Sequence, residues 1–392
     1  MNQYEKYMQM ALDLAKKGVG KTNPNPMVGA VIVKDGIVIS TGYHEKYGEF
    51  HAERNAILNC KEDMTGAEIY VTLEPCCHYG KTPPCTEIII ESGIKKVIVG
   101  CIDDNPIVEN KGIQILRDAG IEVITGVLED ECRKLNEIFF HYITHKTPFV
   151  IMKYAMTADG KIATRTGHSR WITGEVARKH THETRNRVSG IMVGIGTVLA
   201  DDPMLNCRIE NGTNPTRIIC DSTLKIPLDC NIVKTANEIP TIIATGNNYD
   251  KEKKKLLEDK NIKIITTSKE KTDLKELMKI LGEEKIDSVL LEGGGTLNYT
   301  ALELGIVNKV QCYIAPKIFG GATAKTPVEG FGVETADKCF SLELERTEML
   351  GDDLFIEYNV KGWNYVYRDN WRNRKNKKYT PRKSFVNNNC WS

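Results

Sequence analysis

The feature that most constrains this chain is a set of potential zinc ligands spread over residues 51–85. His51 and Glu53 stand two residues apart, and Cys76 and Cys85 each follow a proline. One imidazole and two thiolates fill three corners of a tetrahedral Zn²⁺ site and leave the fourth for a water. Such a water ionises near neutral pH, and a neighbouring carboxylate can carry its proton. H-x-E followed by P-C and a further cysteine is typical of zinc-dependent base deaminases.

Two other interpretations of these residues are a structural zinc site and buried free cysteines. A structural site usually has four protein ligands, and Cys77 or His78 would supply the fourth. We favour a catalytic site, because a structural one leaves Glu53 without a role. We favour Cys76 over Cys77 because it directly follows a proline, as Cys85 does. Eight residues separate the two cysteines instead of the usual two, which points to a particular branch of the class.

Length and composition predict a globular protein of two domains. The 392 residues exceed one ordinary core, and 41% hydrophobic and 27% charged residues are ordinary for globular proteins. A formal net charge of +1 gives no bulk attraction to nucleic acid or membrane. The first residues lack the apolar core of a signal peptide, and no later run is long enough to span a bilayer. We therefore expect a cytoplasmic protein whose twelve cysteines are reduced thiols or metal ligands.

The charge is unevenly distributed along the chain. Residues 361–392 contain nine basic residues and one acidic residue, a net of +8, so residues 1–360 carry about −7. Aromatic residues are interleaved with this charge without any helical or alternating pattern: Trp363, Tyr365, Tyr367 and Trp371. Such a segment could bind single-stranded nucleic acid. We favour a disordered basic extension and expect neither a nucleic-acid nor a membrane partner.

Alternating strand and helix patterns predict two layered α/β domains, at residues 1–145 and 148–360, with a linker near 144–148. In the first domain, an amphipathic helix covers residues 4–17, and Asp35-Gly36 is typical of a hairpin turn. Further strands are expected at 68–73, 96–101 and 121–125, with helices at 51–60, 87–92, near 113–119 and at 129–143. The zinc ligands would then lie at the starts of two helices, where the helix dipole favours thiolates.

Two segments of the second domain are candidates for a phosphate or cofactor site. Residues 193–203 follow an apolar strand, and residues 292–296 lie between a strand at 288–291 and a helical stretch. Their glycines would let backbone N–H groups approach a phosphate at a helix N-terminus. Neither segment matches G-x-G-x-x-G or the P-loop, so ordinary tight turns explain them equally well.

Over residues 1–360 the chain resembles the RibD family of bifunctional riboflavin-biosynthesis enzymes. The motifs occur in family order along both domains. In the first they are Asn23-Pro24-Asn25-Pro26, Gly42-Tyr43-His44, His51-Ala52-Glu53, Val71-Thr72-Leu73-Glu74-Pro75-Cys76 and Gly80-Lys81-Thr82-Pro83-Pro84-Cys85. In the second they are Asp159-Gly160, Ser169-Arg170-Trp171-Ile172-Thr173, residues 197–203, residues 292–296 and Ile314-Ala315-Pro316-Lys317.

The resemblance implies a cytidine-deaminase-like domain followed by a dihydrofolate-reductase-like domain. The first would be a zinc hydrolase with one Zn²⁺ per chain, deaminating 2,5-diamino-6-ribosylamino-4(3H)-pyrimidinone 5′-phosphate. The second would be an NADPH-dependent oxidoreductase that reduces the ribosyl side chain, giving 5-amino-6-ribitylaminouracil 5′-phosphate. It also implies a homo-oligomer.

The resemblance assigns roles residue by residue. Zinc would be held by His51, Cys76 and Cys85, and Glu53 would move the proton. The deaminase would bind its substrate through Asn25, His44, His78, Lys81, Asp103 and Asn105. The reductase would bind its substrate through Ser169, Arg185, Leu205, Arg208 and Glu292, with both arginines suited to phosphate. NADPH would be bound by Ala155, Trp171, Thr197, Asp201, Ser222, Gly294, Gly295 and Thr296.

Two rival hypotheses come from the residues alone. The first is a zinc deaminase of another nucleotide or of an RNA base, with the second domain as an accessory binding module. Deaminases of polymers need a basic channel. The net negative charge of residues 1–360 argues against such a channel. The second is a non-catalytic nucleic-acid-binding protein with structural zinc. It predicts salt-dependent binding that disappears without residues 361–392, and no effect of Glu53→Gln.

Overall fold

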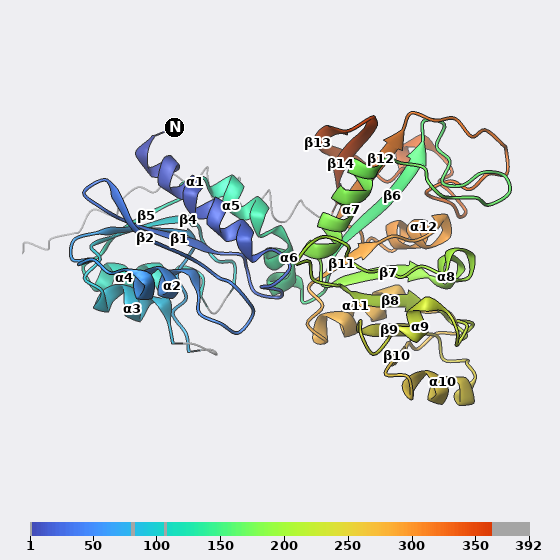
Figure 1. Cartoon of the computed structure of the whole chain (residues 1–392), viewed down its shortest axis with the longest axis horizontal. Helices are drawn as coiled ribbons and strands as arrows, with labels where there is room; N and C mark the ends of the chain where they lie inside the picture. The colour runs from blue at the N-terminus through green and yellow to red at the C-terminus, as the bar shows by residue number, and fades with distance from the viewer. Residues whose placement is uncertain (1, 80–82, 106–107, 363–392) are drawn as a thin grey trace, which may run out of the picture.

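The computed structural model describes residues 2–79, 83–105 and 108–362. Two β-sheets, each covered by helices, stand side by side and are joined through α6 (Figure 1). Lys81 and the extension from residue 363 lie outside the described residues. Among the described residues, no helix combines the length and the apolar character that crossing a bilayer requires.

The first sheet has five strands in the order β2-β1-β3-β4-β5. Strands β1 and β2 form the expected antiparallel hairpin, since Asp35 and Gly36 have φ values of 50° and 78°, as a two-residue turn requires. Strand β3 pairs antiparallel with β1, whereas β3, β4 and β5 run parallel. The strands are β1 (Gly29–Lys34), β2 (Ile37–Tyr43), β3 (Glu68–Leu73), β4 (Lys96–Cys101) and β5 (Glu122–Thr125).

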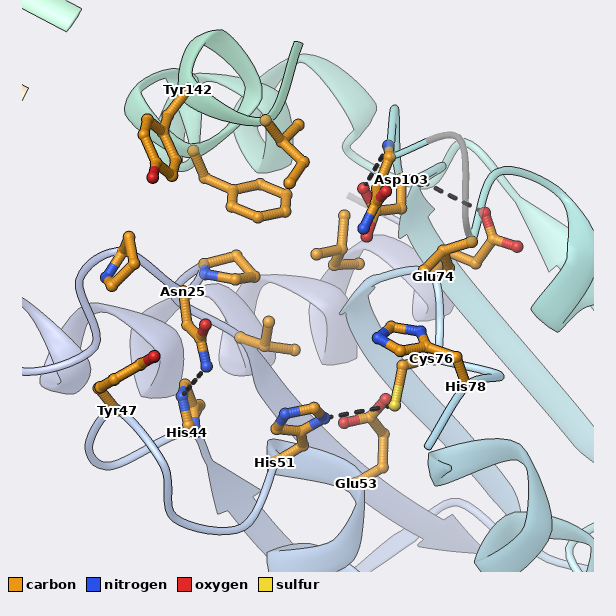
Figure 2. A pocket seen from close by; sticks show the side chains of 18 of the residues that line it. Asn25, His44, Tyr47, His51, Glu53, Glu74, Cys76, His78, Asp103 and Tyr142 are labelled. Carbon is orange, nitrogen blue, oxygen red and sulfur yellow. Dashed lines mark hydrogen bonds between the residues drawn. The ribbon is translucent and has the colours of Figure 1, made fainter. Parts of the chain in front are cut away.

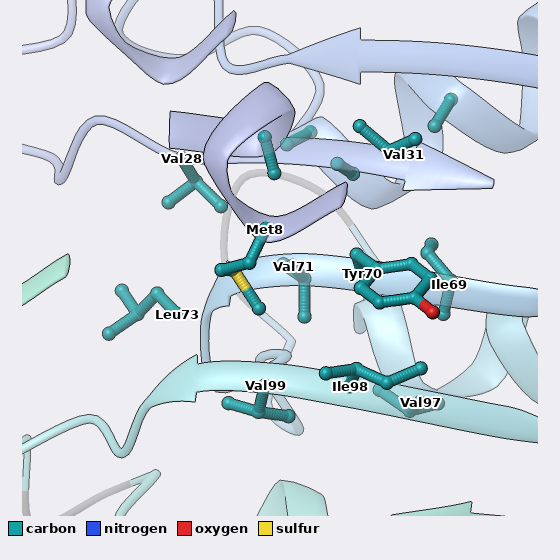
Figure 3. Close-up of a cluster of buried hydrophobic side chains, with 14 of the residues drawn as sticks. Met8, Val28, Val31, Ile69, Tyr70, Val71, Leu73, Val97, Ile98 and Val99 are labelled. Atoms are coloured by element: carbon teal, nitrogen blue, oxygen red, sulfur yellow. The ribbon is translucent and has the colours of Figure 1, made fainter. Parts of the chain in front are cut away.

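Helices cover both faces of this sheet. The helices are α1 (Gln3–Ala15), η1 (Lys16–Gly18), α2 (Ala52–Asn59), α3 (Cys85–Glu91), α4 (Lys111–Asp118), α5 (Glu129–Leu135) and α6 (Glu137–His145). The N-terminal helix forms because Asn2 accepts the backbone N–H of Glu5 and the Glu5 carboxylate accepts that of Asn2. Its apolar face buries Met8 over β3, where Tyr70 and Val71 are also buried (Figure 3). The predicted amphipathic helix is confirmed.

The single helix expected over residues 129–143 is wrong, because the chain breaks at Asn136 between α5 and α6. Asn136 is buried, its side-chain oxygen accepts the backbone N–H of Met27 at 2.8 Å, and its amide donates to the Met27 carbonyl at 2.9 Å. These two hydrogen bonds pair the backbone N–H and carbonyl groups of Met27, which lies 109 residues earlier in the chain. The apolar pattern is continuous through the break, so helical periodicity alone does not detect it.

The second sheet has nine strands in the order β10-β9-β8-β7-β11-β6-β12-β14-β13. The strands from β10 to β12 are parallel, and β14 and β13 complete the sheet in antiparallel fashion. The strands are β6 (Phe149–Thr157), β7 (Gly190–Gly194), β8 (Thr216–Cys220), β9 (Thr241–Thr245), β10 (Lys263–Thr266), β11 (Ser288–Leu291), β12 (Lys309–Ala315), β13 (Leu342–Leu350) and β14 (Asp353–Val360).

Both faces of this sheet are buried. Neighbouring residues of one strand enter separate cores, as Ile218 and Ile219 do on β8, which explains the nearly continuous apolar strands. The helices are α7 (Glu175–Arg187), α8 (Ile195–Asp201), α9 (Asn231–Lys234), α10 (Lys251–Glu258), α11 (Leu274–Glu283), α12 (Gly295–Glu303) and η2 (Ala336–Lys338). The expected layered α/β architecture is confirmed for both sheets.

The two domains meet across helix α6, which ends at His145 and is separated by three residues from the start of β6. Ile138 of α6 packs in one apolar cluster with residues of the second sheet: Phe149, Ile151, Val188 and Leu290. Polar contacts surround it, because the Glu137 carboxylate lies 2.7 Å from Lys309 Nζ and 3.1 Å from Arg187 Nη2. We keep residues 1–145 and 148–360 as the proposed domain bounds.

Replacing Glu137 by Gln is expected to lower the free energy of unfolding by about 2 kcal/mol. Lys309 is 1% exposed and also lies 3.0 Å from Glu345, so it loses one of its carboxylate partners without access to water. As a matched control, Glu334→Gln removes an exposed pair with Lys338 and should change stability by less than about 0.5 kcal/mol. Chemical denaturation of the three proteins measures both effects. Equal shifts would show that the buried ion cluster does not stabilise the domain junction.

Candidate active sites

Three segments of the first domain bring the predicted zinc ligands together. His51 is the N-cap of α2, Cys76 follows β3, and Cys85 is the first residue of α3. His51 Nδ1 lies 3.4 Å from Cys76 Sγ and 3.5 Å from Cys85 Sγ. Tetrahedral zinc with its usual bond lengths separates such ligands by about 3.5 Å. The donor set and the spacing therefore fit Zn²⁺. His51 and Cys85 lie at the starts of two helices as expected, whereas Cys76 lies in the loop after β3.

Local contacts favour the thiolate form of Cys76. A hydrogen bond from the Cys85 thiol and the neighbouring His51 lower the pKa of Cys76 against the opposing effect of burial. The backbone N–H of Cys85 also donates to Cys76 Sγ at 3.3 Å. The thiolate is the form that binds a metal. Among the described residues, the metal-binding group at this position contains His51, Cys76 and Cys85 but neither Cys77 nor His78.

A cavity of about 330 Å³ opens beside these ligands. Figure 2 shows the side chains that line it, which come from well-separated segments of the chain. Eight of the predicted residues are among them: Asn25, His44, His51, Glu53, Cys76, His78, Asp103 and Asn105. The site that the sequence predicted is thus assembled in one place, with Lys81 outside the described residues.

Glu53 lines this cavity and lies on the first turn of α2. Its side chain is 3% exposed, and burial together with the nearby Cys76 raises the pKa of Glu53 to about 7. A carboxyl group with a pKa near neutral can both accept and return a proton. The position suits a proton carrier beside the zinc ligands.

His44 and Asn25 orient one another on the cavity wall. His44 Nδ1 lies 3.0 Å from the Phe50 carbonyl oxygen and must donate to it. The other ring nitrogen of the neutral imidazole, Nε2, can then only accept a hydrogen bond. It accepts one from Asn25 Nδ2, and the two nitrogens lie 3.3 Å apart. Burial lowers the pKa of His44, which keeps the ring neutral. The amide oxygen of Asn25 therefore faces away from His44, and Figure 2 shows this pair at the cavity wall.

Glu74 supports the opposite wall and was missed as a site residue in the sequence. Its carboxylate accepts backbone N–H groups of Asp103 at 3.3 Å, Asn110 at 3.1 Å and Ile113 at 3.3 Å. It thereby fixes the loop that carries Asp103, whose pKa burial raises to about 7. The only sequence signal was its place directly before Pro75-Cys76. Tyr47, Phe139 and Tyr142 also line the cavity and gave no signal.

In the second domain, Glu292 directly follows β11 and forms a two-bond pair with Arg185, Nε to Oε1 at 2.8 Å and Nη2 to Oε2 at 3.0 Å. Burial alone would raise the pKa of Glu292, but the charges of Arg185 and Lys153 hold it at about 2. Arg185 Nη1 also donates to the Asn206 carbonyl. The guanidinium group of Arg185, which we expected to bind phosphate, therefore uses its Nε and Nη2 to bind Glu292. Lys153 was missed, since nothing distinguishes it within its strand.

Arg208 lies beside this pair, held by His182. Its Nε donates to His182 Nε2 at 3.0 Å. Burial and the charges of Arg185 and Arg208 lower the pKa of His182 to about 4, so the ring is neutral and its Nε2 accepts this hydrogen bond. Leu205, three residues earlier, is buried. The structure thus brings the four predicted residues Arg185, Leu205, Arg208 and Glu292 to one region.

The residues predicted for the cofactor lie at the carboxyl ends of the central parallel strands, where open α/β sheets bind ligands. Ala155 is on β6, and Thr197 and Asp201 are on α8, directly after β7. Ser169 Oγ donates to Asp201 Oδ1 at 3.3 Å, and Trp171 is 60% exposed. Ser222 follows β8, and Gly294 caps α12, which begins with Gly295 and Thr296. A Cβ on Gly294 would meet no atom within 4 Å, whereas a Cβ on Gly295 would lie 2.6 Å from Glu329 Cγ, so this helix start is open at Gly294 but packed at Gly295.

Comparisons with known proteins support both halves. The family "RibD C-terminal domain" matches residues 148–356, and the family "Cytidine and deoxycytidylate deaminase zinc-binding region" matches residues 1–101. The riboflavin biosynthesis protein RibD of Actinobacillus pleuropneumoniae is 55% identical over 356 residues, 90% of this chain and 94% of that protein. RibD of Aquifex aeolicus is 43% identical over 89% of this chain and 96% of its own length.

Two solved structures resemble the whole two-domain arrangement. The diaminohydroxyphosphoribosylaminopyrimidine deaminase/5-amino-6-(5-phosphoribosylamino)uracil reductase of Thermotoga maritima matches with a TM-score of 0.81 and 39% identity. That match covers 91% of this chain and 99% of the other. Acinetobacter baumannii RibD matches with a TM-score of 0.83 and 36% identity over 92% of this chain and 99% of its own. These similarities confirm a deaminase-like first domain and a reductase domain of dihydrofolate-reductase-like fold.

Proposed function

Because the chain belongs to the RibD family of riboflavin-biosynthesis deaminase–reductases, we propose that it carries out two successive steps on one pyrimidine phosphate. The first domain hydrolyses the 2-amino group of 2,5-diamino-6-ribosylamino-4(3H)-pyrimidinone 5′-phosphate. The second reduces the ribosyl side chain with NADPH to give 5-amino-6-ribitylaminouracil 5′-phosphate. The observation that carries the proposal is the single cavity in which Glu53, Asn25, His44 and Asp103 surround the zinc-binding group.

In the deaminase, His51, Cys76 and Cys85 would hold one Zn²⁺. When bound, the metal would lower the pKa of a water, so that the water can lose a proton and become a nucleophile for the ring carbon bearing the amino group. Glu53 takes a proton from that water and returns one to the departing nitrogen, so that ammonia leaves. Asn25, His44, Asp103 and Asn105 orient the ring, and His78 with Lys81 binds the phosphate.

In the reductase, hydride comes from NADPH, and the protein supplies binding and orientation. We propose that Ala155, Trp171, Thr197, Asp201, Ser222, Gly294, Gly295 and Thr296 bind the cofactor, and that Ser169, Leu205 and Glu292 contact the substrate. Since Arg185 holds Glu292 in place, the phosphate is assigned to Arg208. From the family we also propose a cytoplasmic homo-oligomer, a setting in which the cysteines stay reduced.

The proposal is tested by supplying the diaminopyrimidine phosphate and NADPH to the purified protein. Ammonia release, oxidation of NADPH and a product mass that reflects both changes are the expected results. Ammonia without any NADPH oxidation would leave a deaminase with a misassigned second domain. No ammonia from protein loaded with zinc would contradict the deaminase assignment and support the rival nucleic-acid-binding hypothesis.

Arg208→Ala is expected to raise the reductase KM for the phosphorylated intermediate about ten- to a hundredfold, because a charged hydrogen bond to phosphate is lost. The maximal rate should change much less, since the phosphate is remote from the reacting carbon. Steady-state kinetics with the deaminated intermediate measure both constants, and Lys251→Ala on the exposed face of α10 is the charge-matched control. An unchanged KM would remove Arg208 from the phosphate site.

A further inference from the structure

One loop of the first domain lines the deaminase cavity and also contacts the second domain. Pro24, Asn25 and Pro26 face the cavity. The preceding residue, Asn23, contacts the second domain, and its Nδ2 lies 2.8 Å from Oδ2 and 3.1 Å from Oδ1 of Asp287. Residues 264 positions apart in the sequence are thus paired directly beside the candidate substrate site.

Asp287 is a rigid anchor for this contact. It is 1% exposed and immediately precedes β11 in the middle of the second sheet. Its Oδ1 accepts the hydroxyl protons of Ser189 and Ser288, both at 2.6 Å. Burial raises the pKa of Asp287, while these hydroxyls and Asn23 favour its ionised form. The Asp287 carboxylate is therefore fixed by hydrogen bonds from its own domain, and its Oδ2 accepts a hydrogen bond from Asn23 of the first domain.

Further contacts between the two domains lie near this loop. A Cβ on Gly20 would lie 2.3 Å from the Asn186 carbonyl oxygen, so the two backbones touch there without room for a side chain. Asn25 and Asp287 both line a cavity of only about 20 Å³, which has room for about one water. Tyr142, which lines the deaminase cavity, donates to the Gly282 carbonyl at 2.9 Å. Residues in and next to one wall of the deaminase cavity therefore contact the reductase domain directly.

We propose that Asp287 of the second domain is a positioning residue for the deaminase, because it holds Asn23 and through it sets the place of Asn25 in the substrate cavity. The inference rests on the proposed function and adds that the reductase domain completes the deaminase site. Small displacements of a substrate-orienting group weaken binding strongly. The zinc ligands and Glu53 lie on other segments, so the metal site itself does not depend on this contact.

The test reverses the pair. Asn23→Asp places two carboxylates face to face, and we expect it to raise the deaminase KM about tenfold with a smaller fall in kcat. Adding Asp287→Asn restores a donor opposite an acceptor, with the amide oxygen still available to Ser189 and Ser288, and should return KM to within about threefold of the original protein. Asn23→Ala, which adds no charge, should raise KM by about threefold.

Reductase kinetics on the deaminated intermediate and zinc content serve as internal controls in every variant, and both should stay within about twofold of the original protein. The inference is overturned if Asn23→Asp and Asn23→Ala leave the deaminase KM unchanged. It is equally overturned if the double variant does not recover, or if both activities fall together in all variants. Absence of ammonia release from the unmodified protein would instead contradict the proposed function, so the two failures are distinguishable.

Discussion

Glu53→Gln is expected to lower the rate of ammonia release by at least about a thousandfold while the protein keeps its zinc. Glutamine has almost the same shape as glutamate but cannot take a proton from water and return it. Proton transfer by a positioned group contributes about 10²- to 10⁴-fold, and Glu53 is buried, so solvent cannot readily replace it. Ammonia release under saturating substrate and metal analysis of the same sample measure the two quantities.

The second active site provides the control for this variant. Glu53 is on α2 of the first domain, so the reduction of supplied deaminated intermediate should proceed at the original rate. Ammonia release within about tenfold of the original would contradict the role of Glu53 as proton carrier. Loss of both activities together with zinc would show that glutamine disturbs the fold instead of the chemistry.

Cys76→Ser is expected to reduce bound zinc from one ion per chain to nearly none and to abolish ammonia release. A serine hydroxyl is a poor replacement for a thiolate, and the remaining two ligands bind zinc weakly. Cys77→Ser is the matched control, because Cys77 neighbours Cys76 but lies outside the group formed with His51 and Cys85. It should keep one zinc and most of the activity.

Zinc content by elemental analysis after dialysis, with ammonia release, separates the two cysteine variants. Zinc lost equally from Cys76→Ser and Cys77→Ser would point to four protein ligands and so to a structural site. Zinc retained by Cys76→Ser would contradict the ligand assignment directly. Either result would remove the main support for a metal-dependent deamination.

The cluster of potential zinc ligands could be predicted from sequence because zinc chemistry restricts both residue types and order. A site that activates water needs three ligands, an open position and a nearby carboxylate, and few arrangements of His51, Glu53, Cys76 and Cys85 satisfy this. The alternation of strands and helices likewise predicted both α/β layers, since apolar periodicity reflects burial. The hairpin at Asp35-Gly36 followed from its turn residues and from the alternating apolar pattern on both sides of them.

What the sequence could not predict depends on contacts between distant residues. The break at Asn136 exists because its side chain bonds the backbone of Met27, which no local pattern records. The pairing of Arg185 with Glu292 takes up the guanidinium edge that appeared suited to phosphate. Similarly, nothing in the sequence near Asn23 indicates a partner in the second domain. The residue types in the sequence indicate which reaction is possible. Which side chains contact one another depends on the order of the strands in the folded sheets.

The most direct test of two successive steps on one chain is a timed experiment in which NADPH is first withheld. We expect the protein to release ammonia from the diaminopyrimidine phosphate without NADPH. NADPH added after ammonia release has stopped should then be oxidised in an amount equal to the ammonia formed. Oxidation of NADPH before any ammonia appears, or ammonia release that is never followed by oxidation, would contradict deamination followed by reduction.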